Sequence, residues 1–238
     1  MLRINNLTKV FPNHRGIFDL NLKIEKGQIF GYLGRNGSGK TTTLKLITGL
    51  LHPDKGEILF EDKSIEENFE EVMRNIGCMF ESPLHYNGFS AYDNMLFVAR
   101  FFPDVPKSRI EEVLELVGLS KNKKEKVGTF SLGMRQRLAF AEAMYNNPKL
   151  MILDEPLNGL DIQGMLEIRE LIKKLAHDGT TFLISSHLSA EVEKTCTHIG
   201  IIQDGQIIDT NTVEQILKLY PSVEDYYLKK TEVQKNVV

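Results

Sequence analysis

The sequence has no tryptophan, only two cysteines and no long apolar run. Cys78 and Cys196 lie far apart and match no metal-ligand spacing, which favours reduced thiols in a cytoplasmic protein. No apolar run approaches the roughly 18 residues that a membrane-spanning helix needs. The N-terminus shows a strand pattern and not a signal peptide. We therefore expect any membrane role to be peripheral.

The chain also lacks an excess of charge of one sign. It has 29 Lys and Arg against 32 Asp and Glu, for a net charge of −3, and no basic stripe that could follow a phosphate backbone. Nucleic acid is therefore not an expected partner. A hydrophobic share of 42% and a charged share of 26% are typical of a globular protein. The length of 238 residues suits one large domain or a domain with an inserted subdomain.

Strand and helix patterns alternate along the chain. Residues 2–7 and 17–24 alternate apolar and polar side chains around turn residues, which predicts antiparallel strands. Later strand-like runs alternate with helical patterns, and these runs lie at 28–33, 76–80, 150–153, 181–184 and 199–202. From about 82 to 147 the pattern is helical. We predict an α/β fold with a mostly parallel sheet, an N-terminal antiparallel β subdomain and an inserted helical subdomain.

Serine residues mark the predicted starts of three helices. Ser90 and Ser108 each precede helical periodicity, and Glu111 lies three residues after Ser108, as in a capping box. Ser131 precedes a run rich in helix formers. We expect Ser131 at a helix N-terminus, where backbone N–H groups can bind an anion.

Residues 34–41, Gly-Arg-Asn-Gly-Ser-Gly-Lys-Thr, fit the phosphate-binding motif G-x-x-x-x-G-K-[ST]. The motif requires a strand before it and a helix after it, and both patterns are present. Lys40 would reach the β- and γ-phosphates, and Thr41 would coordinate Mg²⁺. The motif predicts a P-loop NTPase core whose nucleotide ligands are Gly34, Arg35, Asn36, Gly37, Ser38, Gly39, Lys40, Thr41 and Thr42.

Two acidic residues follow the apolar run at 150–153. A carboxylate at the tip of a buried strand is costly without a cation, and Mg²⁺ held by Asp154 would supply one. Glu155 faces differently and would polarise the attacking water. The alternative is an ordinary strand end with solvated acids. The phosphate-binding motif in the same chain favours the catalytic interpretation.

Four polar residues each follow a different predicted strand: Lys40, Glu81, Asp154 and His187. Ligands of open α/β sheets bind at the carboxyl edge of the strands. We therefore expect His187 near the γ-phosphate and Glu81 beside the Mg²⁺ ion. A single histidine is more often structural, and only this convergence favours a role at the site.

Residues 130–137, Phe-Ser-Leu-Gly-Met-Arg-Gln-Arg, resemble the signature segment of ATP-binding-cassette proteins. Residues 156–161, Pro-Leu-Asn-Gly-Leu-Asp, resemble their D-loop. The resemblance implies that two copies sandwich two ATP molecules head to tail, with the signature of one copy facing the phosphate loop of the other. It implies nucleotide contacts from Ser131, Gly133, Met134 and Asp161. It also implies that Phe11 stacks on adenine, with a simple core phenylalanine as the alternative.

The same resemblance implies a domain organisation. Residues 1–225 would form one ATPase domain, followed by a C-terminal tail at 226–238. Within the domain, residues 1–27 would belong to the antiparallel β subdomain and 82–147 would form the helical subdomain. The ATP-binding core would comprise 28–81 and 148–225.

Three positions depart from the family pattern. Glu81 stands where the family usually has Gln, and Leu132 and Met134 replace the first Gly and the Gln of the signature. Glu81 together with Ser-Leu-Gly-Met resembles the cassettes of bacitracin-resistance and lantibiotic self-protection exporters, which pair with separate membrane subunits.

Aromatic residues are concentrated in residues 80–102. This segment holds seven of the chain's 13 Phe and 7 Tyr residues, namely Phe80, Tyr86, Phe89, Tyr92, Phe97, Phe101 and Phe102. The core of the helical subdomain accounts for some of them. A groove for a helix of a membrane subunit is the other interpretation, because aromatic anchors dominate interfaces.

The resemblance therefore implies an ATPase that uses ATP and Mg²⁺ and works at the cytoplasmic face of the membrane. It would form a homodimer when ATP is bound and would drive export through integral membrane subunits, of a compound such as a lantibiotic or bacitracin. A soluble cassette ATPase of translation or DNA repair is the alternative, although such proteins usually have two cassettes or a long coiled-coil insertion. A non-hydrolysing regulator is a third interpretation, which Glu155 and His187 disfavour.

Overall fold

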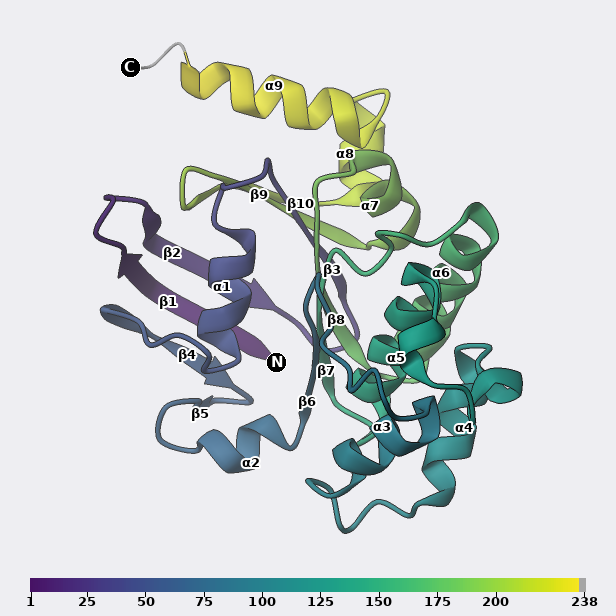
Figure 1. The fold of residues 1–238 in the computed structure, drawn as a ribbon. Coiled ribbons are helices and arrows are strands. Elements are labelled where there is room, and N and C mark those ends of the chain that lie inside the picture. Colours follow the sequence, from purple (N-terminus) through teal and green to yellow (C-terminus); the bar gives the residue numbers. More distant parts are fainter. Residues whose placement is uncertain (236–238) are drawn as a thin grey trace. The chain divides into compact units, whose positions relative to one another are not determined.

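The computed structural model describes residues 1–235, which divide into two compact units (Figure 1). Unit 1 is formed by residues 1–72 and by the chain from residue 181 onward. Unit 2 is formed by residues 73–180. Among the residues that the structure describes, no helix has the length and hydrophobicity needed to cross a bilayer.

The first sheet of unit 1 is antiparallel and has the strand order β2-β1-β4-β5. Its strands are β1 (Leu2–Val10), β2 (Gly16–Ile24), β4 (Lys55–Phe60) and β5 (Lys63–Ser64). Leu2 pairs with Ile24 and Ile4 with Leu22, which confirms the predicted antiparallel pair. The register shifts between Ile4 and Leu7, around Asn6 with φ 48°, so Leu7 is buried with Leu2 and Ile4 despite its odd spacing.

The second sheet of unit 1 carries the phosphate motif. It contains β3 (Ile29–Leu33), β8 (Thr181–Ser186), β9 (His198–Gln203) and β10 (Gln206–Thr212). β3 pairs in parallel with both β8 and β9, whereas β10 is antiparallel to β9. Every residue of β3 and β8 is buried, as expected for strands covered on both faces. These parallel pairs confirm the predicted mostly parallel α/β core.

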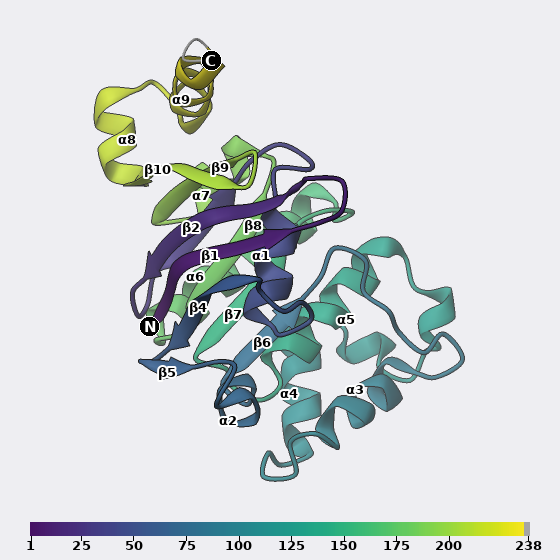
Figure 2. The same ribbon diagram turned by 90° about the vertical axis from the view of Figure 1, so that its left-hand side faces the viewer.

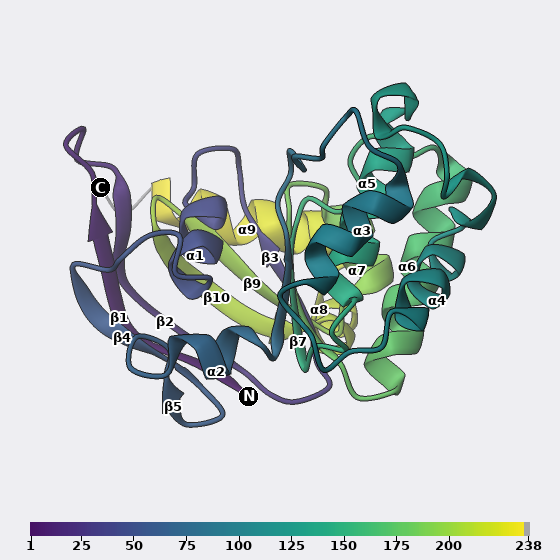
Figure 3. The same cartoon turned by 60° about the horizontal axis from the view of Figure 1, so that its bottom comes forward.

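Helices cover this sheet within unit 1. α1 (Lys40–Ile47) follows β3 and lies between the two sheets (Figure 3). α7 (Ser189–Thr195) packs on β3, where a Cβ at Gly31 would lie 2.5 Å from Val192 Cγ1. α8 (Val213–Leu219) and α9 (Val223–Lys235) follow β10, and α9 packs against α7 and α8 (Figure 1). Residues 226–235, which we expected in a tail, thus form most of α9.

Unit 2 combines two parallel strands with helices. β6 (Ile76–Met79) pairs with β7 (Leu150–Asp154), with Met79 opposite Leu153. The helices are α3 (Ala91–Ala99), α4 (Ser108–Leu116), α5 (Leu132–Met144) and α6 (Ile162–His177); α2 (Phe69–Met73) ends where unit 2 begins. α5 packs on β6, and α3 and α4 pack on α5 (Figure 2). The predicted helical pattern is right for α3, α4 and α5 and wrong for residues 82–89 and 100–107, which contain no helix. Between α4 and α5 the chain forms only two short 3-10 turns, Ser120–Asn122 and Val127–Thr129.

Three serines were predicted to start helices, and the structure shows which of them are caps. Ser90 caps α3 and exchanges hydrogen bonds with Asp93, and Ser131 caps α5 by accepting the Met134 N–H at 3.2 Å, so both predicted starts are confirmed. The predicted capping box at Ser108 is wrong. Ser108 is the first residue of α4 and not its cap, and Glu111 pairs with Lys123 at 2.6 Å. Lys123 lies 12 residues further along the chain, beyond the end of α4, and the spacing of Ser108 and Glu111 does not report its approach.

Candidate nucleotide site

The phosphate motif forms a shaped loop between β3 and α1. Gly37 and Gly39 have φ values of 81° and 112°, a left-handed backbone that suits glycine. The Ser38 N–H donates to the Arg35 carbonyl oxygen at 3.1 Å, and the Ser38 carbonyl oxygen accepts from the Gly205 N–H at 2.9 Å. The loop is therefore held in shape by the protein itself, before any ligand binds.

Positive charge is concentrated inside this loop. The Lys40 side chain is 6% exposed, and its Nζ donates to the Gly34 carbonyl oxygen at 2.7 Å. The first turn of α1 holds no acidic residue that would neutralise the positive end of the helix. Among residues 1–235, the buried Ser38 Oγ has no hydrogen-bond partner. The loop thus presents a buried ammonium, a helix N-terminus and a hydroxyl, which together suit a bound phosphate.

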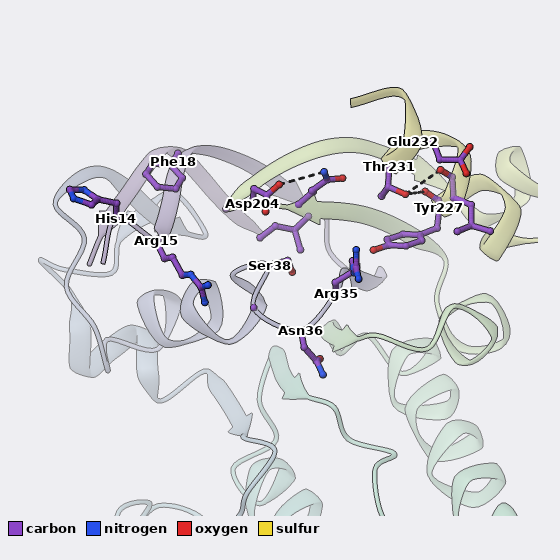
Figure 4. A pocket seen from close by; sticks show the side chains of 16 residues that line it. His14, Arg15, Phe18, Arg35, Asn36, Ser38, Asp204, Tyr227, Thr231 and Glu232 are labelled. Atoms are coloured by element: carbon purple, nitrogen blue, oxygen red, sulfur yellow. Dashed lines mark hydrogen bonds between the residues drawn. The ribbon is translucent and has the colours of Figure 1, made fainter. Parts of the chain in front are cut away.

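A cavity of about 850 Å³ opens beside the loop (Figure 4). The loop lines one side of it from Arg35 to Ser38, and His14 and Arg15 line another. The aromatic rings in its wall belong to Phe18 and Tyr227, which the sequence did not single out. Phe11, expected to stack on adenine, lies in the β1–β2 turn, where its N–H donates to Arg15 and its carbonyl accepts from His14. Its stacking role stays a prediction.

His187 lies on the same side of unit 1 as the loop. It follows β8, and the Ser186 Oγ fixes the turn by accepting the Leu188 N–H at 3.0 Å. A second cavity of about 480 Å³ is lined by His187 together with Gly34, Arg35 and Asn36. The Gly34 N–H also donates to the Ser186 carbonyl oxygen at 3.3 Å. The structure therefore brings His187 and the phosphate loop together within unit 1, as the shared sheet edge predicted.

Asp154 and Glu155 belong to unit 2. Asp154 ends the fully buried strand β7 and is 1% exposed, and Glu155 is 6% exposed. Glu155 has φ 50°, a left-handed backbone that is uncommon for a residue with a side chain. The Asn158 N–H donates to its carbonyl oxygen at 3.2 Å and closes the turn. A buried acid on a strained backbone, as at Glu155, is typical of functional positions.

Glu81 accepts hydrogen bonds from the signature segment at 130–137 and from the D-loop segment at 156–161. Gln136 on α5 donates from Nε2 to the Glu81 carbonyl oxygen at 3.2 Å. Asn158 of the D-loop segment donates from Nδ2 to Glu81 Oε1 at 3.4 Å. Within unit 2, Glu81 is thus connected to both segments. Sequence reasoning missed Gln136 and Asn158, because the burial of Gln136 and the contacts of both residues with Glu81 arise only in the folded chain.

The signature and D-loop segments also pack against each other. A Cβ on Gly159 would lie 2.4 Å from Leu132 Cδ2, and a Cβ on Gly133 would lie 3.2 Å from the Gly159 carbonyl oxygen. Leu132, which departs from the family pattern, therefore covers Gly159. Asp161 caps α6 by accepting the Gly164 N–H at 2.8 Å. The nucleotide contacts expected of Ser131, Gly133, Met134 and Asp161 stay predictions.

Comparison with known sequences gives a consistent assignment. The family model for the ABC transporter matches residues 17–158. The chain is 43% identical over 208 residues to the lantibiotic transport ATP-binding protein SrtF of Streptococcus pyogenes, covering 87% of this chain and 89% of that protein. It is 40% identical over 219 residues to the bacitracin transport ATP-binding protein BcrA of Bacillus licheniformis, covering 92% and 72%.

Solved structures share the fold. An ATP-binding subunit of an ABC transporter superposes with a TM-score of 0.88 at 24% identity, covering 97% of this chain and 99% of that one. A dimeric ATP-binding cassette in a post-hydrolysis state, bound to ADP and Pi, gives a TM-score of 0.81 at 26% identity, covering 90% and 99%. The predicted resemblance to ATP-binding cassettes is confirmed.

Proposed function

We propose, from the premise that this chain belongs to the ABC transporter family and is an ATP-hydrolysing transporter subunit, that it drives export of an antimicrobial peptide through separate membrane subunits. The similarity to the lantibiotic and bacitracin transport proteins carries this proposal. Glu81 with Ser-Leu-Gly-Met at 131–134, which departs from the wider family, supports the same substrate class. The chain would work at the inner face of the cell membrane.

In unit 1, the phosphate loop would hold the nucleotide. Its backbone N–H groups and the N-terminus of α1 would surround the phosphates, and Lys40 would move from the Gly34 carbonyl oxygen onto the β- and γ-phosphate oxygens. His187, which shares a cavity with the loop, would contact the γ-phosphate. The wide cavity beside the loop would take the nucleoside.

In unit 2, the two buried acids would carry the chemistry. The Asp154 carboxylate suits Mg²⁺, because this ion prefers oxygen ligands and a buried carboxylate needs a cation. In unit 1, the Thr41 hydroxyl in the first turn of α1 also offers an oxygen ligand. Bound Mg²⁺ would neutralise charge on the transferred phosphate. Glu155 would accept the proton of the attacking water, and its left-handed backbone would orient the carboxylate. Glu81 would take part in binding the ion and report nucleotide state to α5, whose Gln136 donates to its carbonyl oxygen.

A second copy of the chain would complete each ATP site. Ser131 caps α5, a helix of 13 residues, so the N-terminus of α5 is ordered and positive. In the head-to-tail arrangement, this helix end would face the phosphates bound by the other copy. Its neighbours Gly133 and Met134 and, from the D-loop, Asp161 would lie at the same interface. The structural similarity to a dimeric cassette supports the arrangement.

The membrane subunit would bind an exposed apolar surface of unit 2. Four large apolar or aromatic side chains between residues 84 and 101 of unit 2 are exposed: Leu84 (97%), Phe101 (75%), Tyr86 (62%) and Phe89 (48%). The rings of Tyr86 and Phe89 pack on Phe97 at 4.8 and 5.4 Å, which fixes their orientation. Exposed aromatic groups in a fixed arrangement are typical of anchors at protein interfaces. The aromatic residues near 80–102 are therefore only partly explained by the core.

The proposal is tested in a bacterial strain sensitive to bacitracin and to a lantibiotic. The chain is expressed together with its proposed membrane subunit, and the growth-inhibiting concentration of each compound is measured. We expect protection with the native chain and none with Lys40→Ala, because a charge that neutralises the phosphates is lost. Equal inhibition in both strains contradicts the export proposal.

The partner surface is tested separately. Leu84→Asp and Phe101→Asp should abolish protection and leave ATP hydrolysis by the purified chain unchanged. Leu219→Asp is the matched control, because Leu219 is also 75% exposed but lies on α8 of unit 1. Purification of the chain with ribosomes or DNA, and not with membranes, would favour the alternative of a soluble cassette ATPase.

A further inference from the structure

The C-terminal helix α9 forms one wall of the cavity beside the phosphate loop (Figure 4). Tyr227, Leu228, Thr231 and Glu232 of α9 line it opposite the loop residues Arg35–Ser38. This helix lies outside the residues that the family model matches. The wall is therefore an addition to the phosphate motif, supplied from almost 190 residues further along the chain.

Contacts along α9 hold it firmly against the rest of unit 1. At its start, the Val223 N–H donates to Glu193 Oε2 at 2.8 Å. Tyr226 is 1% exposed, and its ring packs on Tyr220 with centroids 5.3 Å apart. Further along, Lys230 pairs with Asp209 at 2.5 Å. The position of α9 is thus fixed by contacts that lie outside the cavity.

Tyr227 points from α9 toward Arg35 of the phosphate loop (Figure 4). Burial raises the pKa of its hydroxyl, and the nearby guanidinium and backbone N–H of Arg35 partly oppose this increase. Tyr227 and Arg35 line both cavities of the site, the one beside the loop and the one that contains His187. A single phenol therefore stands where the two cavities meet and faces Arg35 of the loop.

We propose that Tyr227 is a positioning residue of the nucleotide site, which holds the loop at Arg35 and closes the cavity over the nucleoside of bound ATP or ADP. The proposal rests on nucleotide binding at the phosphate loop. A bound nucleotide would leave more slowly because α9 limits its path, and the loop would keep its shape between turnovers. Tyr227 acts through Arg35 and the cavity wall and takes no part in the chemical step.

The test compares Tyr227→Phe and Tyr227→Ala with the native chain in ADP affinity by calorimetry and in KM and kcat for ATP. Loss of the hydroxyl alone should weaken ADP binding about 2- to 10-fold, the effect of one hydrogen bond. Loss of the ring should weaken it further. KM should rise in both variants with kcat little changed, because only binding is affected.

Lys229→Ala is the matched control, since Lys229 lies on the same helix, is exposed and does not line the cavity. We expect it to bind ADP like the native chain, and circular dichroism should show α9 folded in all three variants. If Tyr227→Phe binds ADP as tightly as the native chain does, the hydroxyl does not act through Arg35. Tyr227 would then only pack against the cavity, and the proposal that it holds the loop would be overturned. If Tyr227→Ala binds ADP as tightly as the native chain or more tightly, the proposal is overturned. The Tyr227 ring would then contribute nothing to nucleotide binding or would hinder it.

Failure of this proposal is distinct from failure of nucleotide binding itself. If Lys40→Ala loses ADP binding and the Tyr227 variants bind normally, the phosphate loop stands and the role of α9 is refuted. If the native chain binds no ADP, the assignment of the site fails before Tyr227 is considered.

Discussion

Gly77 connects the packing of unit 2 to its candidate functional residues. It lies in β6, where the strand meets α5, and a Cβ there would lie 1.8 Å from the Ala143 carbonyl oxygen and 3.0 Å from Pro148 Cγ. The atom in the way belongs to the backbone of a helix and cannot rotate aside. The substitution Gly77→Ala therefore requires β6 and α5 to separate by an ångström or more.

The expected cost follows from two opposing effects. Overpacking of a core costs about 1–3 kcal/mol, and a rigid backbone obstacle favours the upper end. Replacing Gly by Ala also restricts the unfolded chain, which returns about 0.4–1 kcal/mol. The net loss in free energy of unfolding is then about 2 kcal/mol, or roughly 4–8 °C in Tm for a chain of this size. ATP turnover should fall too, because Gln136 on α5 would move away from Glu81, which follows β6.

Urea unfolding followed by circular dichroism measures this loss. Gly88→Ala is the matched control in unit 2, because a Cβ there meets nothing within 4 Å. We expect the control to stay within about 0.5 kcal/mol of the native chain. If Gly77→Ala were as stable and as active as Gly88→Ala, the close approach of β6 and α5 would not constrain this unit.

Three further predictions concern the proposed ATP site. Glu155→Gln should keep ATP binding, slow hydrolysis about 10²–10⁴-fold and let a dimer accumulate with ATP on gel filtration; hydrolysis at the native rate would move the base elsewhere. Ser131→Arg should block hydrolysis, and mixing it with Lys40→Ala should restore about one working site per heterodimer; no rescue would count against the head-to-tail arrangement. Glu81→Gln should change ATPase activity modestly and protection of cells more; collapse of hydrolysis with protection falling only in proportion would make Glu81 catalytic.

Local sequence patterns correctly predicted the parts of the fold that have a regular hydrophobic period or a known motif. The alternation at 2–7 and 17–24 gave the antiparallel pair, and the motif at 34–41 gave the strand, loop and helix around it. The bulge at Asn6 was not predicted, because one extra residue in a strand does not change the kinds of side chain that the strand contains. Strand β4 escaped because Lys55–Phe60 shows little apolar alternation and its partner β1 lies fifty residues away.

The site was predictable where one strand end or one motif defines a residue. Asp154 ends a buried strand and His187 follows another, and both were located this way. Gln136 and Tyr227 were not, because each sits on a helix and meets its partner through tertiary packing. Side chains that act through distant contacts carry no signal in their own neighbourhood. Phe18 was missed for the same reason, since only the folded β1–β2 hairpin brings it to the cavity.

At Glu155, folding favours a different amino acid from the one that the proposed catalytic role requires. A left-handed backbone costs a residue with a Cβ about 1–2 kcal/mol, and Gly would avoid that cost. A population of variants selected only for heat resistance should therefore lose this acid early, whereas one selected for ATP-dependent survival should keep it. The amino acid found at position 155 after such an experiment would report which pressure had acted on the lineage.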